Sequence, residues 1–99
     1  MTRVAAYVPD LMDRSKVAAA GDVTFVTTPA DLAATPADLV VLDLSRPGVL
    51  EALTDLGGAR TVGFASHVDH ELLAAAAAAG CDEVLPRSRF FARLGELLA

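Results

Sequence analysis

The sequence has 99 residues, of which 54% are hydrophobic, 21% are charged and 5% are aromatic, and its formal net charge is −5. This size and apolar content predict one globular domain, residues 1–99, and exclude an intrinsically disordered chain. The acidity excludes nucleic acid as the main partner, because a phosphate backbone attracts basic surfaces.

The cellular compartment is indicated by what the sequence lacks. Its single cysteine, Cys81, excludes an internal disulfide framework and favours a reducing compartment. No apolar run is long enough to span a membrane, and the segment MTRVAAYVPD is too short for a signal peptide. We therefore expect a cytoplasmic protein with no membrane contact.

Apolar runs typical of strands alternate with helical patterns along the chain. We expect a strand at 3–8, a helix at 11–20, a strand at 22–28, a short helical turn before Pro36, a strand at 38–44, a helix at 47–58, a strand at 60–66, a helix at 68–80, a strand at 82–86 and a helix at 88–99. Ser88 is the expected N-cap of the last helix.

This alternation predicts the fold class. The near-continuous apolar run at 38–44 is typical of a strand buried on both faces of a parallel sheet. Five such βα units predict a flavodoxin-like α/β fold: a three-layer sandwich around a five-stranded parallel sheet in the order 2-1-3-4-5.

Polar side chains follow four of the five expected strands. In an open parallel sheet, ligands bind at the carboxyl ends of the strands, so these residues define the candidate site. The residues expected to line it are Asp10, Asp43, Ser66, His67, Arg87 and Ser88.

The segment ADLVVLDLSRPG, residues 37–48, resembles the third strand and following turn of response-regulator receiver domains. TVGFAS and AAGCDEVLPRSRF resemble two further receiver segments, and the similarity extends over the whole chain. The resemblance implies that Asp43 stands at the phosphoacceptor position. It also places Ser66 at the position of the Thr/Ser that binds the phosphoryl group, and Arg87 at that of the invariant lysine.

Two departures from the receiver pattern bear on activity. Receivers end their first strand with an acidic pair that holds Mg²⁺, whereas here only Asp10 supplies a carboxylate. A magnesium site would therefore rest on Asp10 and Asp43 alone. A guanidinium group is planar and can pair bidentately with a carboxylate. We therefore expect Arg87 to pair with Asp43 in place of a metal ion.

The favoured function is a stand-alone, receiver-like signalling or regulatory module of the pseudo-receiver kind, which is not an enzyme, has no cofactor and acts through protein–protein contacts. One alternative is a genuine phosphoreceiver that binds Mg²⁺ and is phosphorylated on Asp43 by a histidine kinase. The other is a small-anion or nucleotide-phosphate binder that uses Ser66, Arg87 and Ser88.

The last predicted helix is the candidate interface. Adjacent phenylalanines beside arginines are typical of contact surfaces, and receivers often dimerise through their last helix. We therefore expect a protein partner or self-association through Arg89, Phe90, Phe91 and Arg93.

Overall fold

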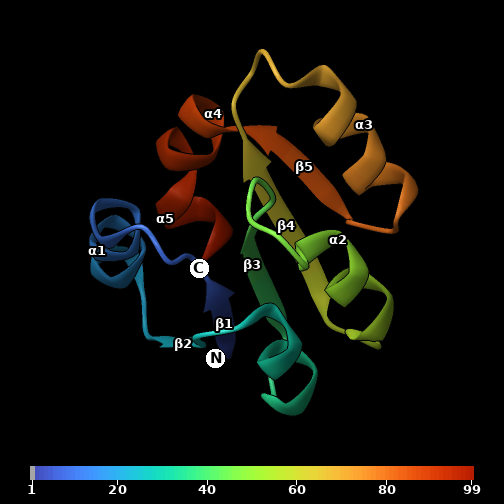
Figure 1. Cartoon of the computed structure of the whole chain (residues 1–99). Coiled ribbons are helices and arrows are strands. Elements are labelled where there is room, and N and C mark those ends of the chain that lie inside the picture. The colour runs from blue at the N-terminus through green and yellow to red at the C-terminus, as the bar shows by residue number, and fades with distance from the viewer. Residues whose placement is uncertain (1) are drawn as a thin grey trace.

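In the computed structural model, which describes residues 2–99, five parallel strands form one sheet in the order β2-β1-β3-β4-β5 (Figure 1). The predicted flavodoxin-like fold and strand order are therefore confirmed. The strands are β1 (Val4–Tyr7), β2 (Val23–Phe25), β3 (Leu39–Asp43), β4 (Arg60–Ala65) and β5 (Glu83–Pro86). The helical elements are α1 (Leu11–Ala20), η1 (Pro29–Ala34), α2 (Val49–Ala52), η2 (Leu53–Asp55), α3 (His70–Ala78), α4 (Arg87–Ala92) and α5 (Leu94–Leu97), where η denotes a 3₁₀ helix.

The helical elements cover both faces of the sheet and give two hydrophobic cores. Val41 and Phe64 point to one face, where they pack with residues of α1, α4 and α5. Val40 and Leu42 point to the other face, which is covered by η1, α2, η2 and α3. The alternation along β3 explains why the strand reads as a continuous apolar run: both of its faces are buried.

Several helical elements are shorter than the sequence predicts. The helix expected at 47–58 is one α-helical turn followed by a 3₁₀ turn, and the helix expected at 88–99 divides at Arg93, whose side chain bonds Glu83. The last helix also begins at Arg87 with Pro86 at its N-cap, so Ser88 is not the cap. Within residues 2–99, no helix is both long and apolar enough to cross a membrane.

Gly63 of β4 fixes the start of the loop that follows β3. A Cβ built at Gly63 would lie 2.6 Å from Leu44 Cδ2, well inside van der Waals contact. Leu44 is buried, and its backbone amide donates to the carbonyl oxygen of Phe64 at 2.9 Å. The absence of a side chain at Gly63 therefore lets Leu44 lie flat on β4, directly after Asp43.

The first prediction concerns this close approach. Gly63→Ala should lower the free energy of unfolding by about 1–3 kcal/mol, because the added methyl group overpacks a closed site. Chemical denaturation at neutral pH measures the change. Gly58→Ala is the matched control, since a Cβ at Gly58 meets no atom within 4 Å. Equal stabilities of the two variants would contradict the prediction.

Candidate functional site

The carboxyl ends of the strands bring polar side chains to one edge of the sheet. Asp10 follows β1, Asp43 ends β3, and Arg87 directly follows β5. Because all five strands are parallel, these ends lie at the same edge (Figure 1). This edge is the predicted site, and its geometry is set by three carboxylates and two guanidinium groups.

Asp43 is almost fully buried, with 3% of its surface exposed, and its carboxylate is bound by the loop that follows it. Oδ1 accepts from the Ser45 backbone amide at 3.1 Å and from the Ser45 hydroxyl at 2.6 Å. Oδ2 accepts from Nε of Arg46 at 3.4 Å, which is a long contact. A carboxylate held by three donors of its own loop escapes the cost of unpaired burial.

Arg87 pairs with Asp13 of α1, and not with Asp43 as the sequence predicts. Nη2 of Arg87 donates to Asp13 Oδ1 at 2.6 Å, and Asp13 is only 4% exposed. The guanidinium carbon also lies 5.4 Å from the ring centroids of both Phe64 and Phe91. The hydrogen bond to Asp13 is the main cause that raises the pKa of Arg87, with the negative charges of Asp13, Asp43 and Asp10 acting in the same direction.

The reason for this different pairing lies in the first turn of α1. Asp13 and Val17 are four residues apart and form the buried side of that helix. Asp13 therefore points toward the sheet, where its burial requires a cation. Arg87 reaches it across Phe64, whereas Asp43 already has Ser45 and Arg46 as donors.

Asp10 acts as the N-cap of α1. Its Oδ1 accepts from the Asp13 backbone amide at 3.0 Å, and its backbone is extended, as N-cap residues usually are. The Asp13 amide is the main cause that lowers the pKa of the Asp10 carboxyl. The Met12 amide and the charges of Arg46 and Arg87 lower it further, while burial opposes them.

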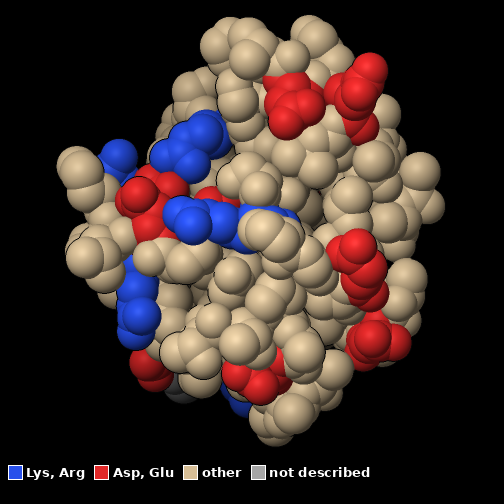
Figure 2. Space-filling model, in the orientation of Figure 1, with Lys and Arg blue, Asp and Glu red and all other residues tan. Residues whose placement is uncertain are grey.

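We call these five residues, Asp10, Asp13, Asp43, Arg46 and Arg87, the ionic cluster. Arg87 donates to Asp13, Arg46 donates to Asp43, and the Asp10 carboxylate accepts from the backbone amide of Asp13. In Figure 2, basic and acidic side chains adjoin between α1 and α4 on the face that is visible. The cluster contains three carboxylates and two guanidinium groups, so its formal charge is −1.

The other predicted site residues lie at the same edge but outside this network. Ser66, His67 and Ser88 are exposed, and none of them hydrogen-bonds a member of the ionic cluster among residues 2–99. The Ser66 hydroxyl oxygen only accepts from the Val68 amide at 3.4 Å. The sequence therefore placed these residues at the correct edge, but the structure does not bring them to Asp43 through a hydrogen bond.

The predicted interface residues of the last helix are largely engaged inside the molecule. Phe90 is fully buried and stacks on Phe64 with 4.5 Å between ring centroids, so it is a core residue, and the interface prediction is wrong for it. Arg93 forms ion pairs with Glu83 and Glu96. Phe91 is half-buried against both rings, which leaves Arg89 as the exposed member of the set.

One member of the cluster, Asp13, was missed by the sequence reasoning, whereas Arg46 belongs to the polar segment 43–46 that follows the third expected strand. A signal for Asp13 was present, because its four-residue spacing to Val17 places it on the inward face of a ten-residue helix. Arg46 stands three residues after Asp43 in a turn, a spacing that allows a local ion pair. Asp13 lies outside the segments that resemble receivers, which is why the resemblance did not single it out.

The sequence matches no protein-family model and no curated protein. Its structure, however, is similar to solved receiver structures. A response regulator from Hahella chejuensis superposes with a TM-score of 0.82 over 99% of this chain and 92% of that one, at 17% identity. The beryllofluoride-activated DrrB receiver domain gives 0.78 over 99% and 97%, at 20% identity. The chain has the receiver-domain fold.

A third solved structure extends the similarity beyond proteins named as response regulators. A protein assigned to pilus assembly (cpaE) from Burkholderia thailandensis gives a TM-score of 0.67 over 97% of this chain and 93% of that one, at 18% identity. At identities of 17–20%, these likenesses establish the shared fold and leave the chemistry to be argued from the side chains.

The receiver resemblance implies a Mg²⁺ ion at the strand ends, where the carboxylates are engaged by groups of the chain itself. Magnesium prefers octahedral oxygen coordination and is usually bound through one or two carboxylates together with water molecules. Here each carboxylate of the cluster already accepts from an amide, a hydroxyl or a guanidinium of the chain. Among residues 2–99, no group of three or more His, Cys, Asp or Glu side chains is positioned to hold a metal ion.

The second prediction tests the ion pair between Asp13 and Arg87. Asp13 is buried, whereas the Arg87 side chain is 43% exposed, so the two partners are not equivalent. Arg87→Ala should lower the free energy of unfolding at pH 7 by about 1–3 kcal/mol, because it leaves a buried charge unpaired. Asp13→Ala should cost less, because the freed guanidinium can turn toward water.

Denaturant unfolding of both single variants and of Asp13→Leu/Arg87→Met checks this order. The double variant removes both charges and should recover much of the stability lost in Arg87→Ala. A larger loss for Asp13→Ala than for Arg87→Ala would contradict this description of the pair.

The third prediction concerns the pH dependence of the Asp10 cap. Because the folded state holds the pKa of Asp10 below its unfolded value of about 3.9, the cap stabilises the protein above that pH. This contribution is lost as the pH falls through the lowered pKa of the folded state. Asp10→Asn keeps a capping oxygen that does not titrate. It should therefore lose less stability than the wild type between pH 7 and pH 2.5, measured by denaturant unfolding; parallel losses would rule out the cap as the cause.

Proposed function

We propose that this protein is a receiver-like regulatory module of the pseudo-receiver kind, which binds partner proteins and does not use Mg²⁺-dependent phosphorylation of Asp43. The observation that carries the proposal is that Asp43 and Arg87 each bind other side chains of the ionic cluster or its loop, and not each other. Of the two groups at the phosphoacceptor and lysine positions, Asp43 is held by Ser45 and Arg46 of the turn that follows it, and Arg87 is held by Asp13 of α1.

Attack by Asp43 on a phosphoryl donor would require a free carboxylate oxygen. Oδ1 accepts two hydrogen bonds from Ser45, and Oδ2 faces Arg46. Reaction at either oxygen would therefore break contacts of the loop and expose a carboxylate that is buried in the folded protein. This reorganisation makes Asp43 a poor nucleophile.

Phosphoryl transfer also requires positive charge near the transferred group, which a metal ion usually supplies. In this chain the acid that follows β1 is Asp10, and its carboxylate caps α1. Arg87 is turned to Asp13 and lies over two aromatic rings, so it is not free to follow a phosphoryl group. The same pairing disfavours the small-anion binder, which needs a free Arg87.

A module without chemistry of its own acts through contacts with other proteins. The most exposed large apolar side chains are Leu11, Met12 and Val68, and all three lie in segments that follow the carboxyl ends of β1 or β4. Exposed apolar side chains beside a polar site are typical of protein-binding surfaces. They support a binding function at this edge of the sheet.

The fourth prediction tests the proposed loss of phosphoacceptor chemistry. Addition of Mg²⁺ and beryllofluoride should leave the backbone amide NMR spectrum of the protein unchanged around Asp43. Incubation with acetyl phosphate and Mg²⁺ should give no increase in intact mass. Both results are expected because Asp43 and Arg87 are committed to other partners.

Two controls make these negative results informative. The DrrB receiver domain, whose solved structure is described as beryllofluoride-activated, serves as the positive control under the same conditions. Asp43→Asn identifies any signal that does not depend on the carboxylate. A mass increase or amide shift that occurs in the wild type and is lost in Asp43→Asn would establish a genuine phosphoreceiver and overturn the proposal.

A further inference from the structure

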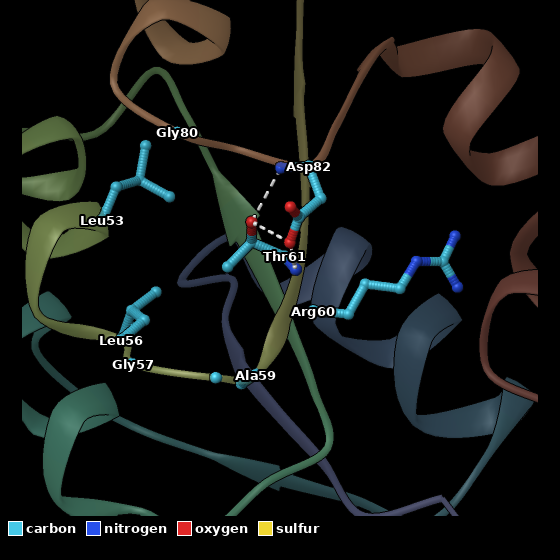
Figure 3. Close-up of a pocket in the computed structure, with 9 residues that line it drawn as sticks. Leu53, Leu56, Gly57, Ala59, Arg60, Thr61, Gly80 and Asp82 are labelled. Atoms are coloured by element: carbon cyan, nitrogen blue, oxygen red, sulfur yellow. Dashed lines mark hydrogen bonds between the residues drawn. The ribbon is translucent and has the colours of Figure 1, made fainter.

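The two outer strands of the sheet differ in how they are protected against pairing with another chain. β5 contains the charged Glu83 and ends in Pro86, which has no amide hydrogen to donate. Figure 3 shows how the start of this edge is fixed to β4: the Thr61 hydroxyl donates to the Asp82 carboxylate and accepts from the Asp82 amide. Charged side chains and proline are usual means by which proteins close a sheet edge.

β2, the other outer strand (Figure 1), has neither of these devices. From Val23 to Thr28 the chain contains no charged residue, no glycine and no proline, and every side chain is β-branched or aromatic. Such residues have the highest propensity for strands. β2 is short, with three residues, but its outer edge is chemically open to another strand.

The backbone of β2 presents unpaired groups outward at alternate residues. The Val26 amide donates to the Ala6 carbonyl oxygen at 2.9 Å, so Val26 faces β1, and the alternation along a strand places Thr24 toward β1 as well. The amides and carbonyls of Val23 and Phe25 therefore point away from the sheet. Among residues 2–99, no backbone group of a loop or turn bonds to them.

The side chains of β2 alternate between the two faces of the sheet. Val23 and Phe25 pack on the core that α1 covers, and the centroid of the Phe25 ring lies 4.6 Å from the guanidinium carbon of Arg14. Thr24 points to the opposite face and is exposed. A strand that pairs with β2 therefore meets apolar side chains on one face and a hydroxyl group on the other.

We propose that the strand that pairs with this edge is β2 of a second copy, antiparallel to the first about a two-fold axis at Thr24. In this register Val23 of each copy faces Phe25 of the other. Because both residues point outward, each such pair exchanges two backbone hydrogen bonds. Thr24 then faces its own counterpart as a pair without backbone bonds.

The reason for choosing a second copy is that the strand is complementary to itself. Val23 opposite Phe25 is a β-branched–aromatic pair and Thr24 opposite Thr24 is a hydroxyl pair, and both kinds are favourable across antiparallel strands. Charge permits the same register, since Asp22 of one copy faces Val26 of the other, and the two aspartates lie at opposite ends of the paired segment.

A contact of this kind is isologous and closes at a dimer, in which the two sheets become one continuous sheet. Because the paired strands are short, the buried area is small and the association is weak and transient. The contact does not involve Asp43, so it is tested separately from the proposed function.

The fifth prediction is a concentration-dependent slowing of hydrogen exchange at the outward amides of β2, measured by NMR. The amides of Val23 and Phe25 face solvent in the monomer and are hydrogen-bonded in the dimer, so their exchange should slow as the protein concentration rises. The Thr24 amide faces β1 in both states and is the internal control. A dimer formed through the helices would leave all three amides unchanged.

Charged variants at Thr24 test the two-fold register. Thr24→Lys and Thr24→Asp each place like charges directly opposite each other, and each should weaken self-association in sedimentation equilibrium by about fivefold or more. An equimolar mixture of the two variants places opposite charges there and should associate at least as well as the wild type. Thr54→Lys, at an exposed residue of η2, is the matched control and should associate as the wild type does. Circular dichroism establishes that every variant is folded.

A cysteine at the same position tests the distance between the strands. The Cα atoms of an opposite antiparallel pair without backbone bonds lie about 4.5 Å apart, which is within the range of a disulfide. Mild oxidation of Thr24→Cys should therefore give a disulfide-linked dimer. Thr54→Cys is the matched control, and the wild type shows the contribution of the buried Cys81.

Three results would overturn the proposal. The first is hydrogen exchange at Val23 and Phe25 that does not depend on protein concentration. The second is a Thr24→Lys variant that associates as strongly as the wild type, because the contact would then lie elsewhere. The third is a mixture of Thr24→Lys and Thr24→Asp that associates no better than either variant alone.

Discussion

The ion pair between the buried Asp13 carboxylate and the half-exposed Arg87 guanidinium joins the elements at the carboxyl edge of this sheet. It joins residues 74 positions apart in the sequence, one in α1 and one directly after β5. In the sheet, β3 and β4 lie between β1 and β5. The Arg87 side chain therefore reaches from the end of β5 across Phe64 of β4 to the helix that follows β1.

The choice of arginine at this position follows from that reach. A guanidinium can lie over aromatic rings and at the same time donate to a carboxylate, whereas an ammonium group is a compact, strongly hydrated charge. Phe64, Phe90 and Phe91 form the aromatic cluster on which it lies. Arginine thus joins α1, β4 and α4 in one contact, and the cost is that this cation is not available to a ligand at Asp43.

The sequence predicted the fold well because the fold depends on repeated patterns. The alternation of strands and helices, and the apolar runs such as 38–44, determine the parallel sheet and its order. The lengths of the helices were predicted less well, since the last helix divides at Arg93, whose side chain donates to Glu83.

The sequence predicted where the site lies, but it did not predict which carboxylate Arg87 binds. Asp10, Asp43 and Arg87 were expected at one edge because the ends of parallel strands coincide there, and they lie there. Which carboxylate Arg87 binds depends on the rotation of α1 about its axis, which carries Asp13 inward. It also depends on Ser45 and Arg46, which reach Asp43 through a local turn. Neither effect is visible in a motif.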